Sequence, residues 1–291
     1  MSGSDPLALY RVGEVGRRLK AASIPCDVHH VVAEGSGDLP AGLPEFLPHV
    51  LDGRADALVC AATEIRLGVP RGLSLVAVLR EHDPRYRCVS RGRASVCGVP
   101  PGSTVVVADP YARAQIRNRL PELGVDLVED LDRLADGLRE GVWAAGCLPP
   151  DLVAAGPLWG LAQEPISITE VMPAVGQGSI ALLTLPGHEC AAGRLLDEPA
   201  ARACLDAETS FLRHVIEVPE TVATAAAGAF GGRIEITGLV AEAGGAWLVL
   251  DEASSPIEFA EVVGREVAES CKEMAWARRV ERSILARSGA P

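Results

Sequence analysis

The chain has 291 residues, of which 48% are hydrophobic and 23% charged, and its formal net charge is −12 at pH 7. This length is sufficient for two or three hydrophobic cores. The acidic balance argues against a nucleic-acid partner, because phosphate binding depends on clustered Lys and Arg. No apolar stretch reaches the roughly 18 residues of a membrane span, and no secretory signal opens the chain. We therefore expect a cytoplasmic protein without a membrane partner.

Cysteine and histidine do not occur in metal-binding patterns. The eight cysteines are scattered, with no C-x-x-C pair and no His at zinc-finger spacing. We expect most of them to be small buried residues in a reducing compartment. The six histidines also lack ligand spacing, so no metal site is predicted. Lys20 and Lys272 are the only lysines and lie in helix-like terminal segments, which argues against Schiff-base catalysis.

Helix and strand patterns alternate along the first 90 residues. Amphipathic or helix-like patterns cover 6–22 and 43–53, and strand-like patterns cover 26–34, 54–64 and 73–79. This β–α–β order predicts a largely parallel sheet.

The same rhythm starts again at about residue 96. Strand patterns are found at 103–109, 125–130 and 143–149, separated by helix patterns at 110–123 and 132–141. Pro110 suits the first turn of its helix. A second α/β unit is therefore expected.

The segment 171–183, VMPAVGQGSIALL, places Gly-Gln-Gly directly before a short apolar run. Gly176 and Gly178 permit backbone angles that other residues avoid, and the run that follows is short enough for a buried strand. A chain that adds one more buried strand after a second α/β unit is expected to cross back into the first sheet. Such a crossover would leave a cleft between two lobes, where the ends of strands converge.

The last hundred residues have the pattern of a small α+β domain. A helix is predicted at 201–215, strands at 231–241 and 246–251, and a long charged helix at 256–285. The predicted fold class is thus α/β: two lobes with parallel-rich sheets and a small α+β C-terminal domain. Lobe 1 is expected at 1–90, completed by 171–190, lobe 2 at 95–170 and the third domain at 192–291.

Seven segments, in this order along the chain, resemble the porphobilinogen deaminase (hydroxymethylbilane synthase) family of tetrapyrrole biosynthesis. The most specific are LDGRADALV and PAVGQG, and the others are SDPLAL, VPRGLSLVAVLREHDPR, ARAQ, LREGVWAAGCLP and ETSFLRHV. The resemblance implies two lobes of the type-II periplasmic-binding-protein kind and a small third domain. It also identifies 171–183 as the return crossover between lobes, with Gln177 facing the cleft.

The resemblance fails at the residue that carries the family's cofactor. Family members anchor a dipyrromethane primer on a Cys of the third domain, and Pro219 takes that position here. The nearest cysteine in sequence, Cys204, is too far along the chain for a local shift of the alignment to restore the attachment. We therefore expect no covalent dipyrromethane and no other cofactor.

The family's acidic motif His-Ser-Leu-Lys-Asp-Val-Pro corresponds to residues 60–66, and its Ser-Ser-Leu-Arg-Arg-Gln-Ala-Gln to residues 108–115. Glu64 replaces the Asp and Thr63 the Lys, and the tandem Arg is lost. We predict Glu64 as the catalytic acid/base and eight substrate-binding residues: Thr63, Arg66, Asp109, Tyr111, Arg113, Gly176, Gln177 and Gly178. A structural alternative for Glu64 is a Glu favoured by a helix dipole, and for each Arg a surface ion pair.

Three functions remain open at this point. The first is a divergent enzyme of specialised metabolism, acting in the cleft on one small pyrrole-like or amino-acid-derived molecule. The second is a non-catalytic metabolite-binding or regulatory protein on the same scaffold. The third is true hydroxymethylbilane synthesis, which ranks last because the primer cysteine and the Arg set are not found. A small molecule is the only partner expected, and the chain is expected to be a monomer or weak dimer.

Overall fold

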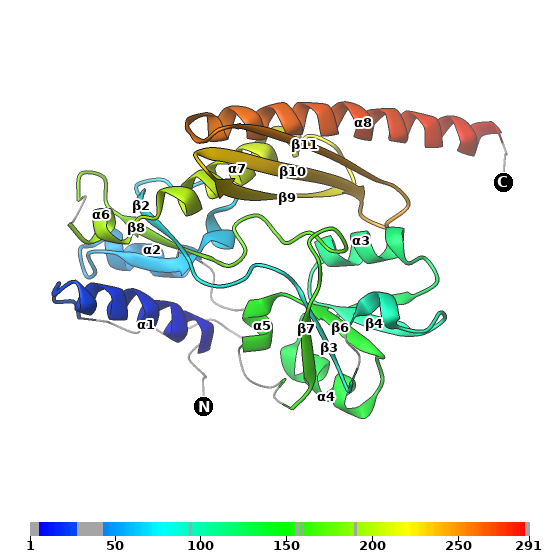
Figure 1. Cartoon of the computed structure of the whole chain (residues 1–291), viewed down its shortest axis with the longest axis horizontal. Helices are drawn as coiled ribbons and strands as arrows, with labels where there is room; N and C mark the ends of the chain where they lie inside the picture. The colour runs from blue at the N-terminus through cyan, green and yellow to red at the C-terminus, as the bar shows by residue number, and fades with distance from the viewer. Residues whose placement is uncertain are drawn as a thin grey trace.

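The computed structural model describes residues 6–27, 43–92, 95–154, 158, 160–188 and 191–288. Figure 1 shows three groups of elements: one around β2 and β8, one around β3 to β7, and a layered group of β9 to β11 under the long helix α8. The predicted fold class is confirmed, since two α/β lobes are joined to an α+β C-terminal domain.

Lobe 1 is built on a sheet of order β1-β8-β2. Its strands are β1 (Leu58–Ala61), β8 (Ser179–Thr184) and β2 (Ser74–Arg80). The accompanying helices are α1 (Pro6–Ala21), α2 (Leu43–Leu51), the short η1 (Ala62–Ile65) that follows β1, and α6 (Ala191–Leu196). All six residues of β8 are buried, which explains the unbroken apolar run of the sequence.

The prediction of a largely parallel sheet is wrong for the strands described in lobe 1. β8 pairs antiparallel with both β1 and β2. The reason is that the returning segment enters between two strands of the same direction and runs opposite to both. The strand predicted at 26–34 lies outside the described residues from position 28 onward.

Lobe 2 contains a mixed sheet of order β5-β4-β6-β3-β7. Its strands are β3 (Arg87–Ser90), β4 (Thr104–Val107), β5 (Gly124–Leu127), β6 (Ala145–Leu148) and β7 (Ala162–Pro165). β4 is parallel to β5 and β6, whereas β3 is antiparallel to β6 and β7. The sequence analysis did not indicate β3 or β7. All residues of the edge strand β7 are exposed, so this strand lacks an apolar pattern.

The helices of lobe 2 begin and end at recognisable signals. In α3 (Pro110–Arg119), the Asp109 side chain accepts a hydrogen bond from the Ala112 amide, and proline occupies the first turn. In α4 (Leu131–Glu140), Asp130 caps the start in the same way, and Gly141 ends the helix at φ 81°. The remaining helices are η2 (Val96–Gly98) and α5 (Pro150–Ala154).

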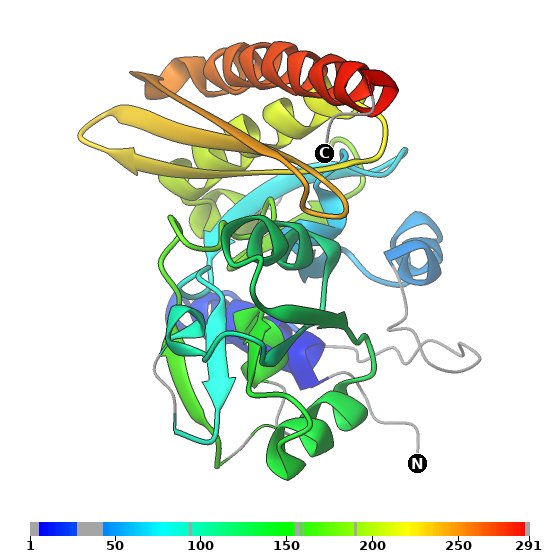
Figure 2. The same ribbon diagram turned by 90° about the vertical axis from the view of Figure 1, so that its right-hand side faces the viewer.

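The third domain is an antiparallel sheet of order β11-β10-β9 with two helices packed on it. It contains α7 (Pro199–Val215), β9 (Thr221–Phe230), β10 (Arg233–Glu242), β11 (Leu248–Pro256), η3 (Ile257–Phe259) and α8 (Ala260–Ser288). Figure 2 shows α8 running along the sheet. The alanine-rich β9 was missed in the sequence because it becomes a strand through its ten-residue pairing with β10. No helix in the described part of the chain is long and apolar enough to cross a membrane.

Candidate functional site

Residues 172–178 of the return crossover contact all three parts of the protein. The buried Gln115 of α3 binds Met172 at two points: its Nε2 donates to the Met172 carbonyl at 3.0 Å, and its Oε1 accepts from the Met172 amide at 2.8 Å. In the third domain, the Thr224 hydroxyl donates to the Pro173 carbonyl at 2.6 Å. The crossover is therefore fixed to lobe 2 and to the third domain before it enters lobe 1.

Gly176 of the crossover lies directly against lobe 1. A Cβ at this position would lie 2.7 Å from the Ala62 carbonyl carbon and 2.9 Å from the Thr63 nitrogen, and the residue has φ +78°. Both constraints require glycine. The Gly176 amide donates to Glu208 of α7 at 2.8 Å, and the other oxygen of that carboxylate accepts from the Ala227 amide at 2.9 Å.

The two residues after Gly176 tie the crossover to the other connection between the lobes, residues 81–86. Gln177 is 5% exposed and its Nε2 donates to the Pro84 carbonyl at 2.6 Å. The Gly178 carbonyl accepts from the Glu81 amide at 2.9 Å. In this conformation the Gln177 amide thus holds the two connections together, and the predicted substrate contact by Gln177 remains a prediction.

The Thr63–Arg66 corner lies at the end of the buried strand β1. Glu64 is exposed, and its Oε1 accepts a hydrogen bond from the Ala61 amide at 3.1 Å. Arg66 Nη1 donates to the Thr63 carbonyl at 2.7 Å. Burial, and next the charge of Glu64, raise the pKa of the neighbouring Cys60 thiol, so this cysteine is not a thiolate nucleophile.

The Asp109–Arg113 corner lies at the N-terminus of α3. One Asp109 oxygen accepts from the Ala112 amide at 2.8 Å and the other from the hydroxyl of the fully buried Tyr86 at 2.9 Å. Burial raises the pKa of the Asp109 carboxyl, although these hydrogen bonds oppose the effect. Arg113 Nε is buried and has no hydrogen-bond partner in the described part of the chain, and Tyr111 is half-buried.

The structure connects both corners to the same pair of linking segments. The Thr63 corner contacts the crossover at Gly176. The Asp109 corner contacts the other connection through Tyr86, two residues after the carbonyl that binds Gln177. Two surface depressions, of about 430 and 900 Å³, lie elsewhere and have none of the predicted site residues in their linings.

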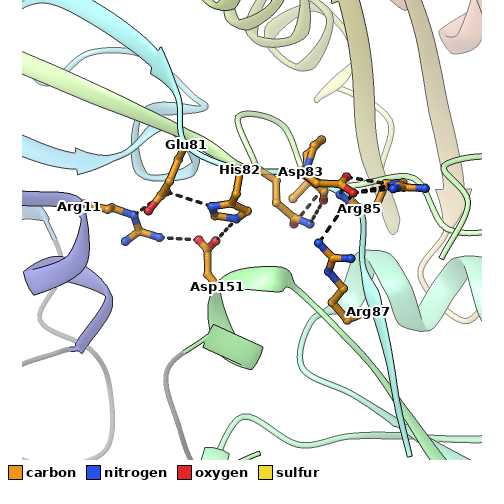
Figure 3. A network of polar contacts seen from close by, with 10 residues as sticks. Arg11, Glu81, His82, Asp83, Arg85, Arg87 and Asp151 are labelled. Carbon is orange, nitrogen blue, oxygen red and sulfur yellow. Dashed lines mark hydrogen bonds and ion pairs between the residues drawn. The ribbon is translucent and has the colours of Figure 1, made fainter. Parts of the chain in front are cut away.

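Sequence reasoning missed a cluster of four charged or titratable side chains between the lobes (Figure 3). Its members are Arg11 of α1, Glu81 and His82 after β2, and Asp151 of α5, hereafter the interlobe ring. The ligand atoms of Glu81, His82 and Asp151 lie within 4.8 Å of one another, the arrangement of a possible metal site. The Arg11 guanidinium, however, already pairs with both carboxylates. The run REHD at residues 80–83 is the one local signal of this cluster in the sequence. Its partner Asp151 lies about 70 residues further along the chain, so the sequence did not connect the two.

The third-domain loop that holds Pro219 has a defined conformation. The Pro219 carbonyl accepts a hydrogen bond from Arg279 Nη1 of α8 at 2.6 Å, and Glu220 adopts a φ of 58°. The Arg279 guanidinium in turn lies 5.7 Å from the centre of the Trp276 ring. Cys204 is 4% exposed within α7, and burial raises the pKa of its thiol to about 11.

Comparison with known proteins places this two-lobed α/β chain in a family. Residues 3–191 match the family model described as "Porphobilinogen deaminase, dipyromethane cofactor binding domain". The chain therefore belongs to the porphobilinogen deaminase family. The matched region ends before α7 and so does not include Pro219.

Similar proteins cover most of the chain. A porphobilinogen deaminase of Chromobacterium violaceum is 30% identical over 248 residues, which are 81% of this chain and 77% of that protein. One from Bordetella parapertussis is 30% identical over 281 residues, 90% of this chain and 88% of that protein. Among solved structures, the methionine-binding protein MetQ aligns with a TM-score of 0.40 at 13% identity, over 65% of this chain and 84% of that chain.

Proposed function

We propose that the chain acts on one small pyrrole-like or amino-acid-derived molecule in the interlobe cleft, without a covalent dipyrromethane, and with Glu64 as the acid/base. The observation that carries this proposal is the Pro219 loop. The residue at the primer position has no thiol, and its carbonyl is held by Arg279. The nearest cysteine in sequence, Cys204, is buried inside a helix. Chemistry that extends a chain on a covalent primer therefore has no attachment point here.

The polar groups at the corners favour a small ligand of low negative charge. Arg113 has a buried Nε without a hydrogen-bond partner in the described structure, so a ligand carboxylate would satisfy it. Thr63 stands where the family motif has Lys, which removes one cation. Each missing charge-assisted hydrogen bond forfeits about 1.5–3 kcal/mol of binding. A tetrapyrrole precursor with many carboxylates would therefore bind weakly.

A second candidate is a non-catalytic binding protein on the same scaffold. It is favoured by the hydrogen bond from the Ala61 amide to Glu64, because a carboxylate that caps the start of a helical turn has a sufficient structural role. The names of the relatives support hydroxymethylbilane synthesis as a third candidate, which the Pro219 loop disfavours.

Intact-mass spectrometry of the purified protein tests whether it lacks a covalent dipyrromethane. We expect the mass of the unmodified polypeptide and no conversion of porphobilinogen to hydroxymethylbilane. A mass excess of two linked pyrrole units on any cysteine, or turnover above a heat-inactivated control, would establish the third candidate and refute the proposal.

Ligand binding is tested with pyrrole-2-carboxylate and porphobilinogen as probes in thermal-shift measurements. We expect the smaller acid to raise the Tm more than porphobilinogen does, because bound ligand stabilises the folded state. Arg113→Gln should abolish this shift. The matched control is Arg117→Gln, an exposed arginine one turn further along α3, which should leave the shift intact. Equal shifts in both variants would exclude the Arg113 corner as the binding site.

Glu64→Gln then separates an enzyme from a binding protein. If the probe is consumed, the variant should bind it normally but react about 10²–10⁴-fold more slowly, since the proton transfer is lost. Glu122→Gln, at an exposed position of lobe 2, is the control and should react at the normal rate. A probe that binds without being consumed would support the non-catalytic candidate instead.

A further inference from the structure

Two buried cysteines of lobe 2 face each other across neighbouring strands. Cys88 of β3 and Cys147 of β6 are directly opposite in the antiparallel register. Both are fully buried in the same hydrophobic cluster, together with Ala112 and Ile116 of α3, so their side chains lie on the α3 side of the sheet. Both are free thiols in this structure, and neither takes part in the proposed function.

The hydrogen bonds of β3 decide how closely the two cysteines approach. On the other side of β3, the Ile166 amide donates to the Tyr86 carbonyl at 2.8 Å, and these two residues continue the register of β3 with β7. Residues 86 and 166 are therefore a hydrogen-bonded pair, and such pairs recur at every second residue of a strand. Cys88 thus directs its backbone N–H and C=O toward β7, which makes it a non-hydrogen-bonded partner of Cys147.

Non-hydrogen-bonded pairs have the spacing that a disulfide needs. Their Cα atoms are about 4.5 Å apart, and their side chains are closer than those of hydrogen-bonded pairs. Disulfides join residues whose Cα atoms are about 4.4–6.8 Å apart. Cys88 and Cys147 therefore meet this requirement at the strand positions that they already occupy.

The surroundings of the pair restrict its reactivity while lobe 2 is closed. Burial, and next the charges of Asp109 and Cys88, raise the pKa of the Cys147 thiol well above its ordinary value. A thiol in this state is a poor nucleophile, because exchange requires the thiolate. We expect the pair to react only when the sheet opens locally, for example where the exposed edge strand β7 covers β3.

We propose that Cys88 and Cys147 form a reversible disulfide with a low-molecular-weight disulfide, such as oxidised glutathione, as the oxidant. One cysteine thiolate attacks a sulfur of that disulfide, which forms a mixed disulfide and releases one small thiol. The thiolate of the second cysteine then attacks the protein sulfur of the mixed disulfide, and the second small thiol leaves. Two protein thiols are oxidised, one small disulfide is reduced to two thiols, and the protons lost by the cysteines end on the released thiols.

The bond locks the strand that continues the connection 81–86 between the lobes. β3 follows this connection directly, and the Tyr86 hydroxyl, two residues before Cys88, donates to Asp109 at 2.9 Å. The disulfide closes a loop of about 60 residues. Such a crosslink restricts the unfolded chain, so the oxidised protein is the more stable form.

Disulfide mapping of the full-length protein, without ligand, tests the pair. The reduced protein is incubated with glutathione buffers of increasing oxidised fraction, in urea just below its unfolding transition, and then alkylated, digested and analysed by mass spectrometry. We expect a peptide pair that links Cys88 to Cys147, forms faster with urea than without it, and is reversed by dithiothreitol. In urea unfolding, the oxidised protein should have an unfolding equilibrium constant about 30–1,000-fold smaller than the reduced protein.

Cys88→Ala should lose both the linked peptides and the stabilisation by oxidation. The matched control is Cys60→Ala, which removes another buried strand cysteine, but one that lies opposite Ala181 of β8; it should keep both effects. Glutathione adducts on separate cysteines without a link from Cys88 to Cys147, or a link that leaves the unfolding constant unchanged, would contradict the proposal. If Cys88→Ala does not fold, the map of the wild-type protein still decides. The outcome is independent of the proposed function, because no ligand or activity enters the measurement.

Discussion

Glu208 should make the protein less stable as the pH rises from about 5 to 8. Its carboxyl group is buried between α7, the crossover and β9, where it accepts hydrogen bonds from the Gly176 and Ala227 amides. Burial raises the pKa of this group from an ordinary value of 4.5 to about 7, although both hydrogen bonds favour the charged form. Desolvation therefore outweighs the hydrogen bonds at this position.

The sign and size of the effect follow from proton linkage. Between pH 4.5 and about 7 the folded protein keeps a proton on Glu208 that the unfolded chain has released. The free energy of unfolding therefore falls as the pH rises through this range and levels off above it. The rise of the Glu208 pKa from 4.5 to about 7 corresponds to a change of about 3 kcal/mol in the free energy of unfolding.

Urea unfolding of the wild type and of Glu208→Gln at several pH values isolates this contribution. The variant does not titrate, and its amide nitrogen opposes one of the two backbone donors, so at pH 5 it should be less stable by about 1–3 kcal/mol. The difference in free energy of unfolding between the wild type and the variant should shift by about 3 kcal/mol against the wild type between pH 5 and 8. Glu122→Gln should show no such change. A difference between wild type and Glu208→Gln that stays constant with pH would refute the reasoning.

Three further substitutions test the crossover and the loop at the primer position. Gly176→Ala should lower the free energy of unfolding, measured with urea, by about 3 kcal/mol or more, because the residue has a positive φ and its new Cβ would clash with lobe 1. Gly53→Ala, at a similar φ but in open space, should lower it by only about 1 kcal/mol. Gln115→Leu should lower the free energy of unfolding by about 2–5 kcal/mol, because both backbone groups of Met172 lose their buried partner. A loss of less than about 1 kcal/mol would show that the crossover does not depend on this contact. Arg279→Ala should speed amide exchange at residues 218–221, while Arg278→Ala, which removes only an exposed ion pair, should not; equal rates in both variants would mean that Arg279 does not order the loop.

The sequence by itself determined the elements whose signals are local. Pro110 marks the start of α3, and the apolar run after Gly178 marks the buried strand β8. The order of matching segments also led to the family, which the family model confirms. Each of these inferences depends on residues close together in the chain or on their order along it. Such information can be read from the sequence without knowing the fold.

Only the tertiary structure decided which distant groups meet and in which direction strands pair. The antiparallel entry of β8 and the interlobe ring depend on partners far away in the chain, up to 140 residues in the contact between Arg11 and Asp151, which no local pattern specifies. The same reason applies to the hydrogen bonds of Gln177 and Asp109, whose contacts with a ligand are implied by the family resemblance and stay predictions. In the fold their polar atoms bind the Pro84 carbonyl and the Tyr86 hydroxyl. A buried polar group must find a partner, and the identity of that partner is set by packing in three dimensions.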